Sequence, residues 1–149
     1  MDTSKEYIEM CEKAEEIQPH DDWEDGDFFY HELKVQESAG YGGGVFVECD
    51  QEYTLHEAYR SKGDRHKNKR WVWLPRQDQL QEIVRGSKHL HLLAYEFAAY
   101  FHGSIDPLYP EIGRDNFTVD SDNSMEQMWL AFVMKVKYSK IWDGEEWVK

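Results

Sequence analysis

The first apolar positions of the chain follow a helical spacing. They recur every three or four residues, which places them on one face of an α-helix. These residues are Tyr7, Met10, Ala14 and Ile17. A capping box at Thr3–Glu6 predicts the start of this helix, and Gln18-Pro19 predicts its end, because proline disfavours helical backbone at the residue before it.

The pattern then changes to the alternation of apolar and polar residues that is typical of strands. Residues 28–35 predict one strand, Gly40–Gly44 interrupts it, and residues 45–49 predict its antiparallel partner. Residues 51–59 predict a third strand, although their second half also fits a helix. Trp71–Leu74 has the composition of a further short strand.

Three helical segments follow. Pro75 suits the first turn of a helix, where a missing amide hydrogen costs nothing, and Gly86 suits its C-terminal cap. Residues 89–102 are apolar on nearly all sides, which predicts a buried central helix. A second capping box at Ser124–Gln127 predicts the start of the last helix. Asp143-Gly144 between aromatic residues predicts a C-terminal hairpin.

This order of elements predicts the α+β class. We expect a small antiparallel sheet, a meander of three to four strands, packed against about four helices, with a short C-terminal hairpin. The 149 residues predict a single domain over 1–149, because no linker or repeat divides them. A domain of this length can bury roughly 70% of its unfolded surface and needs no disulfide to be stable.

Composition and charge narrow the function classes. The net charge is −13, and it is unevenly distributed: residues 1–59 carry −14, residues 60–90 carry +6 and residues 91–149 carry −5. Such a field repels nucleic acids and favours basic partners. The start lacks the pattern of a signal peptide, and no run approaches the ~18 apolar residues of a membrane span. Cys11 and Cys49 do not have metal or disulfide-framework spacing, so we expect a cytoplasmic protein without membrane contact.

The histidines and glycines of the sequence do not have the spacings of known metal sites or catalytic motifs. His91 and His102 lie about 16 Å apart on a helix, and His89 and His91 point about 200° apart there, so neither pair shares an ion. Phosphate-binding, nucleophile-elbow and dinucleotide motifs are absent from the sequence. We therefore expect a protein that is not an enzyme and that has no catalytic residues, metal or cofactor.

The first candidate site is an acidic face at the front of the chain. Its carboxylates would stand where a nucleic acid presents phosphates, and its tryptophan would anchor a partner. The predicted residues are Glu9, Glu12, Glu15, Glu16, Asp21, Asp22, Trp23, Glu24, Asp25 and Asp27. A solubilising surface is the alternative interpretation.

The second candidate site is a basic loop that leads into an aromatic strand. Cationic side chains there would contact phosphates, and a nearby aromatic ring would stack on a base. The predicted residues are Arg60, Lys62, Arg65, Lys67, Lys69, Arg70 and Trp71. The strongly negative net charge argues against direct nucleic-acid binding, so this loop could instead bind an acidic protein patch, including that of a second copy, or simply be solvated.

Four blocks of the sequence resemble small proteins encoded by phages and prophages of Gram-positive bacteria. They are residues 6–18, residues 73–82, residues 123–135 and residues 142–147, about a third of the chain. The resemblance implies a phage context, in the cytoplasm of an infected or lysogenic host. It implies no activity, cofactor or catalytic residue.

These observations lead to one main functional hypothesis. We expect a phage accessory protein that uses its acidic face as a nucleic-acid mimic to inhibit a host nucleic-acid-handling defence protein, such as a CRISPR effector or another nuclease. One alternative is a nucleic-acid-binding module that uses the basic loop. A second alternative is a metal-dependent hydrolase whose ligands only the fold brings together, and a homo-oligomer is compatible with each hypothesis.

Overall fold

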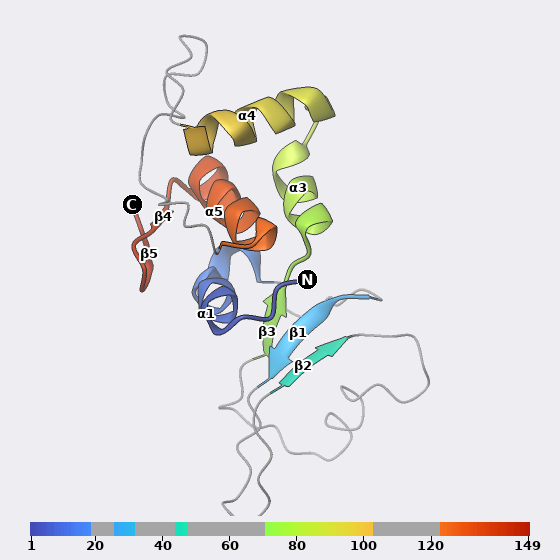
Figure 1. The fold of residues 1–149 in the computed structure, drawn as a ribbon, viewed down its shortest axis with the longest axis vertical. Coiled ribbons are helices and arrows are strands. Elements are labelled where there is room, and N and C mark those ends of the chain that lie inside the picture. Colours follow the sequence, from blue (N-terminus) through green and yellow to red (C-terminus); the bar gives the residue numbers. More distant parts are fainter. Residues whose placement is uncertain (19–25, 32–43, 48–70, 103–122) are drawn as a thin grey trace, which may run out of the picture.

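A computed structural model describes residues 1–18, 26–31, 44–47, 71–102 and 123–149 (Figure 1). Within these ranges the chain forms four α-helices, a short 3-10 helix and five strands, which confirms the α+β class. The helices are α1 Lys5–Lys13, η1 Glu15–Ile17, α3 Gln77–Arg85, α4 Leu90–His102 and α5 Met125–Tyr138. The strands are β1 Phe28–His31, β2 Gly44–Val47, β3 Trp71–Leu74, β4 Ile141–Trp142 and β5 Trp147–Val148.

The larger sheet has the strand order β2-β1-β3, and both pairings are antiparallel. Phe28 stands opposite Val47 on one side and opposite Leu74 on the other. The predicted meander is wrong, because a meander would place the strands in chain order, whereas β1 lies at the centre here. The expected strand at 51–59 falls outside the described residues.

The two faces of this sheet differ in what they contact. Phe28 and Tyr30 pack against the main core together with Val72 and Leu74, whereas the alternating residue Phe29 is buried on the opposite face. Helix α1 provides the most extensive helical contact with the sheet, at β3. Within the described part of the chain, Figure 1 shows the sheet at one end and α4 at the other, with α1, α3 and α5 between them. The sheet is therefore not packed directly against all four helices of the described residues: α1 contacts it, and α4 lies far from it.

Helix α5, and not α4, is the central helix. Its residues 129–134 are buried at every position, because α1, α3, α4 and the hairpin surround it. Helix α4 packs on α5 through Phe97 and Tyr100, whereas its residues Leu90, Ala94 and Ala98 are exposed. The prediction of a buried central helix at residues 89–102 is therefore wrong. Two helices of this chain are apolar on nearly all sides, and their composition alone does not reveal which of them the other elements surround.

Local signals fix several helix ends. The predicted capping box of α5 is confirmed: Gln127 N donates to Ser124 Oγ at 3.1 Å, and Ser124 N donates to Gln127 Oε1 at 3.0 Å. In α1 the capping residue is Ser4, whose Oγ accepts from Tyr7 N, so the predicted box at Thr3–Glu6 is wrong by one residue. Gly86 ends α3 with φ +49°, as expected of a glycine cap.

Pro75 lies before α3 and not in its first turn. Arg76 is the N-cap, and its backbone N–H donates to Gln79 Oε1 at 2.9 Å. Pro75 contributes its carbonyl oxygen instead, which accepts a buried hydrogen bond of 2.5 Å from Tyr7 Oη. This bond joins α1 to the segment between β3 and α3.

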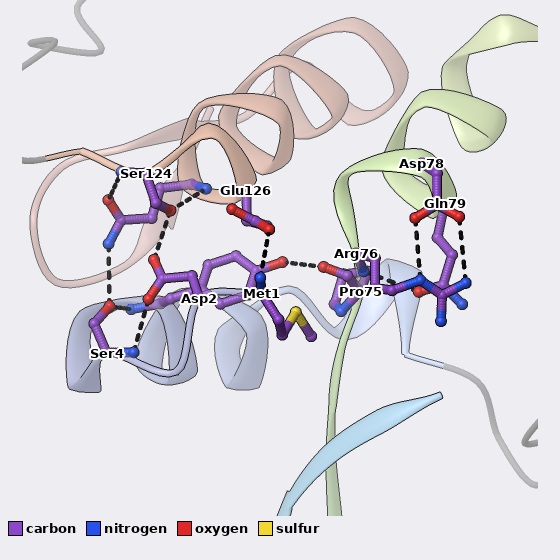
Figure 2. A network of polar contacts seen from close by, with 11 residues as sticks. Met1, Asp2, Ser4, Pro75, Arg76, Asp78, Gln79, Ser124 and Glu126 are labelled. Carbon is purple, nitrogen blue, oxygen red and sulfur yellow. Dashed lines mark hydrogen bonds and ion pairs between the residues drawn. The ribbon is translucent and has the colours of Figure 1, made fainter. Parts of the chain in front are cut away.

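A polar network ties the first residues of the chain to the start of α5 (Figure 2). Asp2 Oδ2 accepts from Ser124 Oγ at 2.5 Å, and Asp2 Oδ1 accepts from Ser4 N at 2.7 Å. The amino group of Met1 lies 3.3 Å from Glu126 Oε1. One carboxylate thus links the starts of α1 and α5, and the helix dipole favours negative charge at both places.

Candidate acidic interaction surface

Helix α1 buries one side and presents carboxylates on the other. Tyr7, Met10 and Cys11 are buried in the core. The glutamates predicted from the helical spacing lie on the remaining surface, where Glu15 and Glu16 are exposed and Glu9 and Glu12 are half-buried. Residues 5–17 contain five glutamates and two lysines, a net charge of −3. Glu9 and Glu12 are thus held on α1, whereas Glu15 and Glu16 follow on η1, so the helix that the spacing predicted up to Gln18 ends at Lys13.

Two lysines reduce the charge of this face locally. Lys5 Nζ lies 3.3 Å from Glu9 Oε1 in an exposed pair along the helix. Lys140 forms an ion pair with Glu16. Partial burial opposes ionisation of Glu16, but the hydrogen bond and charge of Lys140, with a backbone hydrogen bond, outweigh it and lower the pKa of Glu16. The pair with Lys140 therefore favours the ionised form of Glu16.

The C-terminal hairpin packs directly against α1. Trp147 Nε1 donates a buried hydrogen bond of 2.9 Å to the carbonyl oxygen of Met10. Lys13 Nζ donates to the carbonyl oxygen of Glu145 and also lies 5.8 Å from the ring centroid of Trp142. The rings of Trp142 and Trp147 are 5.1 Å apart between centroids. These contacts place the turn of the hairpin beside the end of α1.

This turn adds carboxylates that the sequence analysis did not assign to the acidic face. Asp143, Glu145 and Glu146 are all exposed. Asp143 Oδ1 accepts from Glu146 N at 2.7 Å and from Glu145 N at 2.8 Å, and these bonds lower the pKa of Asp143. The run Asp143–Glu146 predicts a hairpin turn from the sequence, but it does not reveal that this turn lies beside α1. We name the carboxylates of α1, η1 and this turn the acidic surface: Glu9, Glu12, Glu15, Glu16, Asp143, Glu145 and Glu146.

Asp27 does not belong to this surface, and its assignment to an exposed acidic face is wrong. Its side chain is only 4% exposed and accepts a hydrogen bond of 2.5 Å from Gln79 Nε2. The neighbouring Gly26 carbonyl accepts from Arg76 Nη1 at 2.6 Å. Asp27 therefore joins the start of β1 to the first turn of α3.

Most of the other predicted site residues fall outside the described ranges. Those of the acidic face are Asp21, Asp22, Trp23, Glu24 and Asp25. Those of the basic loop are Arg60, Lys62, Arg65, Lys67, Lys69 and Arg70. Trp71 is the first residue of β3, where its backbone pairs with that of His31. Both assignments stay predictions for these residues.

The histidines of the described ranges do not form a metal site. His89 and His91 have stacked rings with centroids 5.7 Å apart. The predicted opposite orientation is wrong, because α4 begins at Leu90 and His89 precedes it. Across the described part of the chain, no three side chains of histidine, cysteine, aspartate or glutamate converge in a way that could hold an ion.

Comparisons with protein-family models, curated proteins and solved structures find no significant match for this chain. Of the helices that the structure describes, none has the length and apolar character needed to span a membrane. Because the comparisons find no match, a functional proposal for this chain depends on the acidic surface itself.

Proposed function

We propose that this protein acts by binding and that the acidic surface is its contact for a positively charged host protein. In the phage context that the sequence blocks imply, the partner is a nucleic-acid-handling defence protein, such as a nuclease or CRISPR effector. The acidic surface occupies its basic groove in place of nucleic acid and thereby inhibits it. The protein needs no catalytic residue or cofactor for this role.

One observation carries the proposal: the hairpin turn is fixed against α1. The Trp147–Met10 hydrogen bond and the Lys13–Glu145 contact bring together two acidic segments that are far apart in sequence. Carboxylates held on a fixed framework lose less conformational entropy when they bind than carboxylates on a free tail. Fixed negative charge also steers association with a basic partner and makes it fast.

The charge pattern predicts how such a complex behaves. Contacts between exposed carboxylates and a basic groove weaken as salt is added, because ions screen them over about 10 Å at 0.1 M. Glu9 and Glu16 are engaged by lysines, whereas Glu145 and Glu146 are exposed in the hairpin turn and are the best candidates for contact with the partner.

The test combines capture with competition. The protein, immobilised at low salt, should retain from a bacterial host lysate a nucleic-acid-binding protein that duplex DNA then releases. The purified pair should show inhibition of that protein's activity on nucleic acid. Capture that yields no nucleic-acid-binding protein, or a complex that DNA leaves intact, would contradict the proposal.

A matched pair of variants locates the contact. Glu145→Lys/Glu146→Lys should weaken binding at least about tenfold, because each reversal sets like charges together. Asp78→Lys/Glu82→Lys makes the same change in net charge on exposed positions of α3 and should bind normally. Equal loss in both variants would show that net charge matters and that the acidic surface does not.

A further inference from the structure

The hairpin turn binds the ammonium group of Lys13. Lys13 Nζ donates to the carbonyl oxygen of Glu145 and lies over the Trp142 ring, 5.8 Å from its centroid, which is a cation–π distance. The backbone N–H groups of Glu146 and Glu145 lower the pKa of Asp143, and the charge of Lys13 lowers it further. The turn thus surrounds one ammonium group with a carbonyl oxygen, an aromatic ring and a carboxylate within electrostatic range.

This ammonium group can leave the turn without opening the core. Lys13 is exposed, and so is its hydrogen bond with Glu145. Exposed ionic and cation–π contacts are weak, and each shifts an equilibrium by about fivefold or less. The hairpin stays on α1 through other contacts, because Trp142 and Trp147 are both buried and Trp147 Nε1 donates to the carbonyl oxygen of Met10.

A released Lys13 has a second acceptor on its own helix. Glu9 lies four residues before Lys13 on α1, and this order of glutamate and lysine is the favourable one for an ion pair along a helix. The Glu9 side chain is 45% exposed and is paired only from the other direction, by Lys5 at 3.3 Å. Lys13 can therefore exchange one negative neighbour for another.

We propose that the hairpin turn is a binding site for a lysine side chain of the partner and that Lys13 occupies this site in the free protein. The inference rests on the proposed function, because the basic groove of the partner supplies the lysine. The incoming ammonium group replaces that of Lys13 at Glu145 and Trp142, and Lys13 turns toward Glu9. Lys13 thus competes with the partner and makes binding weaker than an empty site would allow.

The geometry of the site favours lysine over arginine. A lysine ammonium is compact, and its three N–H donors can point to separate acceptors. A guanidinium is flat and binds best when it stacks on an open ring or meets two oxygens side by side. Trp142 is only 7% exposed and offers no open face for stacking, and Lys13 meets a single carbonyl oxygen in the turn.

The first test follows Lys13 by NMR while octalysine is added at low salt. The Hε protons of Lys13 lie near the Trp142 ring, whose ring current moves their resonances away from ordinary lysine values. Saturating octalysine should return these resonances toward ordinary values, and octaarginine at equal saturation should move them less. Lys13 resonances that stay in place at saturation would overturn the proposal, as would equal movement with both peptides.

The second test removes the competing side chain. Lys13→Met should bind octalysine at least about threefold more tightly in calorimetric titration, because the site is then empty. Lys5→Met makes the same change in net charge on the same helix and should gain less than about twofold, because salt screens the remaining effect of charge. Equal gains would show that net charge alone acts. Weaker binding by Lys13→Met would show that Lys13 only holds the turn in place.

These results are separable from the test of the proposed function. Octalysine that binds while Lys13 keeps its place would reject the lysine site and leave the acidic surface as the contact. Displacement of Lys13 by octalysine, together with a lysate capture that yields no nucleic-acid-binding protein, would reject the proposed partner and leave the lysine site. Absence of octalysine binding at low salt would overturn this inference.

Discussion

Trp147 and Met10 form a buried hydrogen bond of 2.9 Å between residues 137 positions apart, from the indole Nε1 of β5 to a carbonyl oxygen of α1. Trp142, the other tryptophan of the hairpin, is equally buried, at 7% exposure, but its Nε1 has no hydrogen-bond partner. The two side chains are therefore buried to the same extent, but only Trp147 donates a hydrogen bond, and only the ring of Trp142 lies near Lys13 Nζ. This difference makes a controlled experiment available.

We expect Trp147→Phe to destabilise the protein more than Trp142→Phe. The first substitution leaves the carbonyl of Met10 without its donor, and a lost hydrogen bond of this kind costs about 1–3 kcal/mol. The second removes an unsatisfied N–H and costs packing and part of the contact between the ring and Lys13 Nζ. Urea unfolding of both variants measures the difference in free energy of unfolding, and equal costs would show that the hydrogen bond contributes nothing.

Sequence reasoning predicted the elements of the fold better than their arrangement. The capping box of Ser124 and Gln127 and the glycine cap at Gly86 depend on neighbours within a few residues, so the sequence reveals them directly. The contact between Trp147 and α1 joins the two ends of the chain, and no local pattern predicts it. The extension of the acidic surface onto Glu145 and Glu146 was missed for this reason.

Burial was the other quantity that the sequence did not settle. Helices α4 and α5 are both strongly apolar, and only the packing of the other elements places α5 at the centre. Asp27 lies in an acidic segment and was assigned to its exposed face, but the amide of Gln79 holds its carboxylate inside. A buried carboxylate that accepts a hydrogen bond from a distant side chain has the same sequence signature as a solvated one.

The side chain of Gln18 acts as a partner for the edge strand β3. Its Oε1 accepts from Trp73 N at 2.8 Å, and its Nε2 donates to the carbonyls of Cys11, at 2.9 Å, and Trp73, at 3.3 Å. We expect Gln18→Ala to lower the free energy of unfolding by about 1–3 kcal/mol, because β3 loses this partner at its edge. Gln81→Ala, a half-buried glutamine of α3, should cost less than half as much. Similar losses in urea unfolding would contradict this role.

Cys11 and Tyr7 predict a loss of stability at alkaline pH. Burial raises the pKa of the Cys11 thiol, and burial together with the neighbouring Cys11 raises the pKa of the Tyr7 hydroxyl. Each group ionises first in the unfolded chain, so stability is complete below the unfolded pKa, about 8.5 for the thiol, and falls as pH rises above it. The expected slope is up to about 1.4 kcal/mol per pH unit for each group.

The control for this pH dependence is Cys11→Ala. This variant should be less stable at pH 7, because it leaves a cavity in the core, but its stability should fall less steeply than that of the parent protein between about pH 8.5 and 9.5, because it lacks this thiol. Above about pH 10 both proteins should lose stability through Tyr7. Urea unfolding across this range measures the slopes. Parallel slopes from pH 8.5 would assign the effect to groups other than Cys11.

The Lys88–Glu96 ion pair joins α4 to the short segment between α3 and α4. Its Nζ–Oε2 distance is 2.6 Å, and the carboxylate is buried whereas Lys88 is partly exposed. We expect Lys88→Met to lower the free energy of unfolding by about 1–3 kcal/mol, less than for a fully buried pair, because Glu96 is left desolvated without its cation. Lys88→Met/Glu96→Leu removes both charges and should recover most of that loss. Urea unfolding of the two variants distinguishes the cost of an unpaired charge from a general loss of packing. A double variant that is no more stable than Lys88→Met would indicate that the aliphatic stem of Lys88, and not its charge, stabilises α4.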